Sequence, residues 1–369
     1  MEFGWSPAQR EIHARMRALG AEAESSPPDL RMPLLAHGGA LGLPLPPEYG
    51  GGGLDLLTTA LAYEALGATL ADSGVLLAAG AHLFGVALTI ARVGTPAQRQ
   101  AWLPRIATGE AMATVAVTEA GTGSDVASLQ AIAEATPAGL RLTGEKRYVT
   151  WADRADVYLA LARDGGGERG LTALLVPRAT PGVRVGEPLQ TAGLRGARLA
   201  PVSFAGCEVG PDAILGRAGA GSAVFQVAMT FERALVLAFR LGALDRALTD
   251  AARFARERDA GGAPIARHQA VAHRVARMKL RLETSRWLVY RAAWELDQGR
   301  RAQAEAALAK WHLAESALES ALDALRLRGG AGFLEESGLP AAVDDALGGS
   351  IHSGTSDVLA TVVARWLGL

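Results

Sequence analysis

The sequence is poor in residue types that define whole classes of protein. It contains one cysteine, Cys207, so an internal disulfide or a cluster of thiolate ligands is excluded, and a reducing cytoplasm is the expected compartment. Its 37 basic residues nearly balance 38 acidic ones, and no basic cluster alternates with aromatic residues, so we expect no nucleic-acid partner. The seven histidines are scattered, so no metal site is expected.

Long apolar runs are also rare. The exception is residues 74–91, GVLLAAGAHLFGVALTIA, which contain no Asp, Glu, Lys or Arg. This length is at the lower limit for crossing a bilayer, but the run contains His82 and three glycines and is flanked closely by polar helical segments. We therefore expect a buried helix and no membrane association. The first residues lack the basic-then-apolar layout of a secretion signal, so we expect no export.

The pattern of apolar and polar residues changes twice along the chain. Residues 6–108 show apolar positions at helical spacing, broken by proline and glycine. Short runs rich in Val, Leu, Thr and Tyr then alternate with turn residues over 113–215, which predicts about seven antiparallel strands. From Ser222 onward the pattern is helical again, with helices long enough for a bundle. The expected α+β fold has an N-terminal helical domain (1–112), a central antiparallel β domain (113–219) and a C-terminal four-helix bundle domain (220–369).

One acid stands out in the C-terminal part. Between Ser222 and Leu244 the only charged residues are Glu232, Arg233 and Arg240, and the apolar spacing predicts a largely buried helix. A carboxylate there has two explanations. It forms an ion pair with a basic residue elsewhere in the fold, or it is a general base whose pKa is raised by desolvation. These residues alone leave both explanations open.

Five further motifs are weak when taken singly. In the motif over 146–156, Tyr148 and Thr150 are expected on one face of a strand. A ring beside a hydroxyl suits a flat heteroaromatic ligand, although an ordinary sheet has the same pattern. The glycines and hydroxyls of the first and last suit an anionic or polar ligand, although turns share this composition. The motifs are VTEAGTGSD (117–125), KRYVTWADRAD (146–156), RERDAGGAPIARHQ (256–269), LRGGAGF (327–333) and SIHSGTSD (350–357).

In this order, and with LGLPLPPEYGGGGLD, GTPAQRQAWLPRIATGE and FERALVLAFRLGALDRAL, the motifs resemble the acyl-CoA dehydrogenase family over essentially the whole chain. The resemblance implies a flavoenzyme that binds FAD between the β domain, the C-terminal helices and a neighbouring subunit of a homodimer or homotetramer. It also implies an acyl thioester as substrate. The implied electron acceptor is an electron-transfer flavoprotein or oxygen.

The resemblance assigns cofactor contacts by position. Tyr148 would flank the flavin ring and Thr150 would lie near N5. Arg326 stands where relatives commonly have Gln and can still donate to an anion, whereas Gly261-Gly262 replaces an aromatic-glycine pair and weakens one packing contact. The other flavin contacts would come from Thr118, Gly123 and Ser124. The partner subunit's FAD would be reached by Arg258, Gln269, Arg326, Gly329 and Gly330, and the adenine side would be approached by Thr355.

The most informative departure from the family pattern is Ser353. Most relatives carry there the glutamate that removes the substrate α-proton, and a serine hydroxyl is no substitute unless a base activates it. Isovaleryl-CoA and long-chain acyl-CoA dehydrogenases carry the base instead on the long helix before an Arg, which corresponds to Glu232 and Arg233. The resemblance therefore favours Glu232 as the catalytic base. Arg233, Ser353 and His352 are candidate substrate-binding residues.

The substrate carrier remains open at this stage. The combination of FER, SGTSD and a terminal LGL resembles bacterial members of secondary metabolism, several of which oxidise acyl groups on a carrier protein instead of on CoA. Two alternatives are a flavin monooxygenase or oxidase on the same fold, and a catalytically silent flavoprotein homologue. Rapid reoxidation of the flavin by air would favour the first alternative, and the second is tested by whether the purified protein is yellow, with an absorbance band near that of free flavin.

Overall fold

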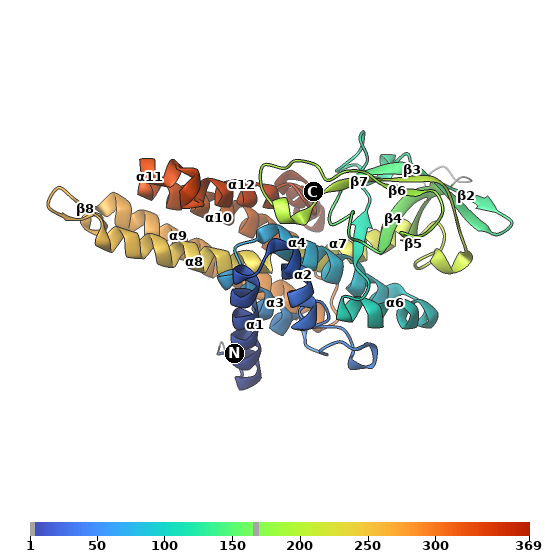
Figure 1. The fold of residues 1–369 in the computed structure, drawn as a ribbon, viewed down its shortest axis with the longest axis horizontal. Coiled ribbons are helices and arrows are strands. Elements are labelled where there is room, and N and C mark those ends of the chain that lie inside the picture. Colours follow the sequence, from blue (N-terminus) through green and yellow to red (C-terminus); the bar gives the residue numbers. More distant parts are fainter. Residues whose placement is uncertain (1–3, 165–169) are drawn as a thin grey trace.

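The computed structural model describes residues 4–164 and 170–369 and begins with a group of packed helices (Figure 1). Thr95 and Pro96 begin one of these helices: Pro96 is its first residue, and the Thr95 side chain caps it by accepting a hydrogen bond from Gln98 N at 3.1 Å. The helices are α1 (Pro7–Ser25), α2 (Pro28–His37), α3 (Leu56–Thr69), α4 (Ser73–Gly80), α5 (Leu88–Val93) and α6 (Pro96–Thr108).

The apolar run is a core helix, as predicted. It extends without interruption over Ser73–Val93, and 94% of its most apolar window is buried inside the protein. Its middle, Ala81–Ala87, is wound as a π-helix, a wide turn often found near functional sites. His82 in this segment bonds Ile106 O through Nε2 and Ala113 N through Nδ1, both at 3.0 Å. The imidazole thereby ties this helix to α6 and to the start of the sheet.

A seven-stranded sheet follows, with strand order β1-β4-β2-β3-β7-β6 and β5 paired with β4. The number of strands agrees with the prediction. The pairing is antiparallel except that β4 runs parallel to both β1 and β2, which short turns between neighbouring runs did not indicate. The strands are β1 (Ala113–Ala116), β2 (Ile132–Thr136), β3 (Gly139–Val149), β4 (Val157–Asp164), β5 (Leu171–Pro177), β6 (Val183–Val185) and β7 (Ala200–Val209).

The C-terminal region is a set of long helices that extends away from the sheet (Figure 1). The helical pattern expected from Ser222 onward is interrupted at Val236-Leu237, which separates two helices. A hairpin, β8 (Asp259–Ala260) and β9 (Ala263–Pro264), closes the far end of this region. The helices are α7 (Gly221–Leu235), α8 (Ala238–Glu257), α9 (Gln269–Asp297), α10 (Gln303–Arg328), α11 (Gly330–Phe333), α12 (Leu339–Gly349) and α13 (Ser356–Trp366).

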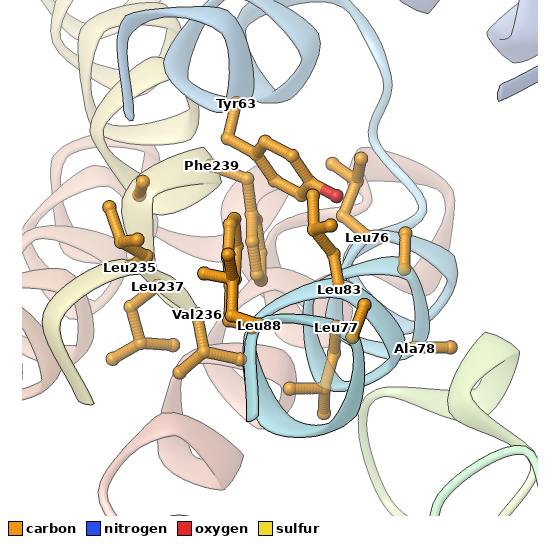
Figure 2. Close-up of a cluster of buried hydrophobic side chains, with 14 of the residues drawn as sticks. Tyr63, Leu76, Leu77, Ala78, Leu83, Leu88, Leu235, Val236, Leu237 and Phe239 are labelled. Carbon is orange, nitrogen blue, oxygen red and sulfur yellow. The ribbon is translucent and has the colours of Figure 1, made fainter. Parts of the chain in front are cut away.

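The N-terminal and C-terminal helices share one core. Figure 2 shows side chains such as Tyr63 and Leu83 from the first region packed against Val236 and Phe239 beside the break between α7 and α8. Here α3 and α8 are in direct backbone contact through two glycines. A β-carbon on Gly67 would lie 1.8 Å from Phe239 O, and one on Gly242 would lie 2.0 Å from Glu64 O. Neither position can therefore hold a larger residue unless the helices move apart.

A buried acid strengthens the same contact between regions. Glu64 of α3 accepts hydrogen bonds from Arg286 Nε at 2.8 Å and from the Tyr290 hydroxyl, both on α9. Burial raises the pKa of Glu64, and the Arg286 charge opposes this shift. Sequence periodicity did not single out this cluster, because Glu64 is more than 200 positions from Arg286 and Tyr290.

Candidate active site

Glu232 lies in the last turn of α7, and its side chain is enclosed by other parts of the fold. The residue is 7% exposed, and Oε1 accepts a hydrogen bond from the Ser353 hydroxyl at 2.5 Å. Burial raises the pKa of the Glu232 carboxyl, while the Ser353 hydrogen bond and the charges of Arg233 and Lys310 oppose that rise. No carboxylate–cation ion pair to Glu232 exists among the described residues, because the nearby cations bond to backbone oxygens instead.

Two buried cations hold the turn that carries Ser353. Arg233 Nε donates to Ser353 O at 3.0 Å, and Lys310 Nζ of α10 donates to Gly354 O at 2.6 Å. The turn is left-handed at both residues, with φ of 56° at Ser353 and 99° at Gly354. The two cations therefore fix a strained backbone that presents the serine hydroxyl to Glu232.

Sequence reasoning missed Lys310. It is 1% exposed, and burial followed by the charge of Arg233 lowers its pKa to about 7. The available signal was a lone lysine within the alanine-rich stretch 304–314, AEAALAKWHLA. Arg233, a candidate substrate-binding residue, donates from its guanidinium Nε to the turn that carries Ser353.

The other side of the carboxylate faces the π-helical segment. A β-carbon placed on Gly85 would lie 2.8 Å from Glu232 Oε2 and 3.0 Å from Val115 Cγ2. The absence of a side chain at Gly85 thus leaves room for Oε2. It also locates the carboxylate beside β1, which ends two residues before Thr118.

The loop after β1 is held by a buried ion pair. Lys146 Nζ lies 2.7 Å from Glu119 Oε1, and the same carboxylate accepts from the backbone N–H groups of Gln130 and Ala131. The backbone oxygen of Thr118 accepts a hydrogen bond from Arg147 N of β3 at 2.7 Å. The loop therefore has a fixed shape, although part of it is exposed.

This loop has the features of a cofactor cradle. Gly123 and Ser124 are exposed, and a β-carbon on Gly123 would meet no atom of the described residues within 4 Å. The Thr122 hydroxyl is buried without a hydrogen-bond partner in the described part of the chain. Bare backbone and an unused hydroxyl are suited to the polar edge of a flavin.

The expected alternation of Tyr148 and Thr150 on one strand face is wrong. The strand β3 ends at Val149, Tyr148 has a left-handed φ of 57°, and the pairing register with β7 shifts between Lys146 and Val149. This bulge turns the Tyr148 ring outward, where it is 53% exposed. Thr150 lies in the following turn, and its carbonyl accepts from Thr114 Oγ1 at 2.6 Å. Tyr148 directly follows Arg147, whose N–H bonds Thr118 O, whereas Thr150 contacts β1 through Thr114.

A second group of predicted cofactor residues lies at the opposite end of the molecule, around β8 and α11 (Figure 1). All of them are exposed. The space beside Gly329 and Gly330 is open, because a β-carbon on either would meet nothing within 4 Å. Exposed guanidinium groups beside open glycine backbone suit a diphosphate. The group comprises Arg258, Gln269, Arg326, Gly329 and Gly330. Thr355 lies elsewhere, as the N-cap of α13 beside the serine turn.

Comparison with known proteins identifies this combination of fold and site. Three models of acyl-CoA dehydrogenase domains match the chain: the N-terminal domain over residues 6–110, the middle domain over 114–207 and the C-terminal domain over 219–368. The fold is that of a flavin-dependent oxidoreductase with FAD as its cofactor. The chain belongs to the acyl-CoA dehydrogenase family.

Several similar proteins act on carrier-bound groups, according to their names. An L-prolyl-[peptidyl-carrier protein] dehydrogenase from Pseudomonas fluorescens is 40% identical over 91% of this chain and 89% of its own length. A solved structure, PigA with FAD and proline, has a TM-score of 0.96 and 32% identity, with both chains covered completely. The prolyl acyl carrier protein oxidase AnaB has a TM-score of 0.96 and 31% identity, covering 99% of this chain and 100% of its own.

Proposed function

We propose that this enzyme catalyses α,β-dehydrogenation of an acyl thioester on a carrier protein in secondary metabolism, with a prolyl group as the first candidate. The observation that carries the proposal is the enclosed Glu232 carboxylate, which has one oxygen bonded to Ser353 and the other beside Gly85. The names and identities of the carrier-protein relatives support the choice of carrier.

In this proposal Glu232 removes the α-proton of the thioester. Burial raises the pKa of Glu232, which makes its ionised form a stronger base than an exposed glutamate. The fixed loop around Thr118 and the bulge at Tyr148 would hold the flavin ring beside β1. FAD supplies the acceptor for the hydride that leaves the β-carbon.

We further infer that two subunits complete each cofactor site. The strands that carry the loop after β1 and the hairpin around β8 lie at opposite ends of the molecule (Figure 1), so each FAD is expected to take these two groups of contacts from different subunits. A second copy that presents Arg258, Gln269 and Arg326 would close the site. This arrangement supports a homodimer or a tetramer built from such dimers.

The choice of carrier is tested by anaerobic reduction of the bound flavin. We expect L-prolyl carrier protein to reduce the flavin at least about tenfold faster than L-prolyl-CoA at equal low concentration, which needs only ~1.4 kcal/mol of additional contact with the carrier. The measurement is bleaching of the flavin absorbance in a stopped-flow instrument. Unloaded carrier protein and the same carrier with a fatty acyl group are the controls. Equal or faster reduction by the CoA ester contradicts the carrier proposal.

A methyl group at Gly85 tests the position of Glu232. In Gly85→Ala the new carbon would lie 2.8 Å from Oε2, so the carboxylate has to move, and a displacement near 1 Å can cost about 100-fold in rate. We expect FAD to remain bound, whereas the contact of the new carbon with Val115 Cγ2 at 3.0 Å should lower the melting temperature modestly. The matched control is Gly80→Ala, whose added carbon meets Val236 Cγ2 at 3.2 Å and no part of Glu232. Similar rates for the two variants would contradict the geometry.

An oxidase is the second candidate, because AnaB is named an oxidase and has the same fold. In that case the reduced flavin would react rapidly with oxygen without another acceptor. Mixing the substrate-reduced enzyme with aerated buffer distinguishes the two outcomes: slow return of flavin absorbance supports a dehydrogenase, and return within the turnover time supports an oxidase.

A further inference from the structure

The Ser353 hydroxyl stands between two other polar side chains. Its Oγ lies 2.5 Å from Glu232 Oε1 and 2.9 Å from His352 Nδ1. An ionised carboxylate can only accept, so the hydroxyl donates its single proton to Oε1. The imidazole must then donate from Nδ1 to Oγ. The donor direction therefore runs from His352 through Ser353 to Glu232.

The charge state of His352 agrees with this direction. Burial, with the charges of Lys310 and Arg240, lowers the pKa of His352 to about 3, so the ring is neutral at physiological pH. A neutral imidazole has one N–H, and the contact to Ser353 places it on Nδ1. Its Nε2 is buried without a partner among the described residues. The side chain is thus oriented through Nδ1 alone.

The two oxygens of Glu232 have different surroundings. Oε1 is occupied by the serine hydroxyl, whereas Oε2 accepts no hydrogen bond from any residue in the described parts of the chain and faces Gly85. Arg233 on α7 and Lys310 on α10 contribute charge but bond to Ser353 O and Gly354 O. On the π-helical side, both ring nitrogens of His82 are bonded to backbone atoms.

We propose that His352 and Ser353 are positioning residues: their donor chain holds the carboxylate by Oε1, so that Oε2 is the oxygen that receives the substrate proton. The proposal rests on Glu232 being the base. In the step, the α C–H bond breaks, its proton forms an O–H bond at Oε2, and the electron pair stays on the substrate carbon. Throughout the step the serine proton remains on Oγ and keeps Oε1 as an acceptor.

Two substitutions of Ser353 distinguish the effect of its hydroxyl from the effect of its backbone conformation. Ser353→Ala and Ser353→Gly both delete the donor, but only glycine is favoured at a φ of 56°. Loss of a hydrogen bond to the ionised form raises the pKa of a carboxyl group. In both variants we therefore expect Glu232 to become protonated at higher pH than in the native protein. The flavin reduction rate near pH 7 should fall roughly tenfold, the effect of one hydrogen bond to a charged group, and recover at higher pH.

Protonation of Glu232 is followed by infrared difference spectroscopy of the FAD-loaded protein. The band of the protonated carboxyl is assigned by its absence in Glu232→Gln. Subtraction of the spectrum of this variant also removes the signals of Lys310 and the flavin. An unchanged midpoint in both variants overturns the proposal, and so does a shift in Ser353→Ala that is missing in Ser353→Gly, because that pattern reports backbone strain. This titration uses no thioester, so its outcome is independent of the proposed reaction.

The role of His352 is tested by two variants whose new side chains are similar in size. His352→Asn keeps an N–H donor close to the position of Nδ1, whereas His352→Leu removes it. We expect the Glu232 midpoint to stay near the native value in the asparagine variant and to rise in the leucine variant, by less than in Ser353→Ala. Equal midpoints in both variants would show that His352 does not act through Ser353.

Discussion

Replacement of Glu232 by glutamine is expected to slow flavin reduction by the thioester about 10²- to 10⁴-fold, the usual contribution of a general base. The amide has nearly the same shape as the carboxylate and keeps a carbonyl that can accept from Ser353, but it cannot take up a proton at neutral pH. Anaerobic stopped-flow absorbance of the bound flavin measures the effect. The loss should affect the limiting rate at saturating substrate.

Two controls make the Glu232→Gln result specific. FAD content and melting temperature should match those of the native enzyme, because removal of one buried charge does not break an ion pair at this site. Glu232→Asp keeps the acid but withdraws it by one methylene, so its rate should lie between the other two. A glutamine variant that reduces its flavin at the native rate would assign the base to another residue and leave Glu232 a structural acid.

The largest effect on stability is expected for Arg286→Met. This change leaves the Glu64 carboxylate, whose side chain is 3% exposed, without its cation, and breaking a buried pair in this way costs about 3–5 kcal/mol. The Tyr290 hydroxyl alone cannot compensate for the lost charge. Urea denaturation, followed by the tryptophan fluorescence of the flavin-free protein, measures the decrease in the free energy of unfolding.

The same helix offers a matched control. Arg291→Met removes an arginine whose side chain is 57% exposed and 3.5 Å from Glu305, so its cost should be about 0–1 kcal/mol. Adding Glu64→Gln to Arg286→Met removes the stranded charge and should restore part of the stability. Equal losses in Arg286→Met and Arg291→Met would mean that the Glu64 cluster contributes no more than a surface pair.

The sequence was sufficient for the order of the three regions, because apolar spacing and the proline and glycine breaks between segments act locally. It was insufficient at the break between α7 and α8, where residues 234–239, ALVLAF, favour helix locally. This break lies where Val236 and Phe239 pack against α3 and the apolar run, so tertiary packing decides it. The parallel pairing of β4 similarly depends on partners distant in sequence.

The candidate site shows the same division between local and distant information. Glu232 stands out because it is an isolated acid in an apolar helix, and family resemblance adds a role. Its contact with Ser353 joins positions 121 residues apart, and the contribution of Lys310 comes from a third helix. The bulge at Tyr148 is a property of the pairing between β3 and β7, so alternation along one strand could not reveal it.

The glycine contact between α3 and α8 has a consequence for synthesis of the protein. The partner surface of Gly67 does not exist until the ribosome has translated beyond Gly242, so the first helices emerge long before they can reach their final packing. During this interval their apolar faces are exposed to the cell. We therefore expect N-terminal fragments that end before Gly242 to leave this face of α3 uncovered and to be less stable than the whole chain.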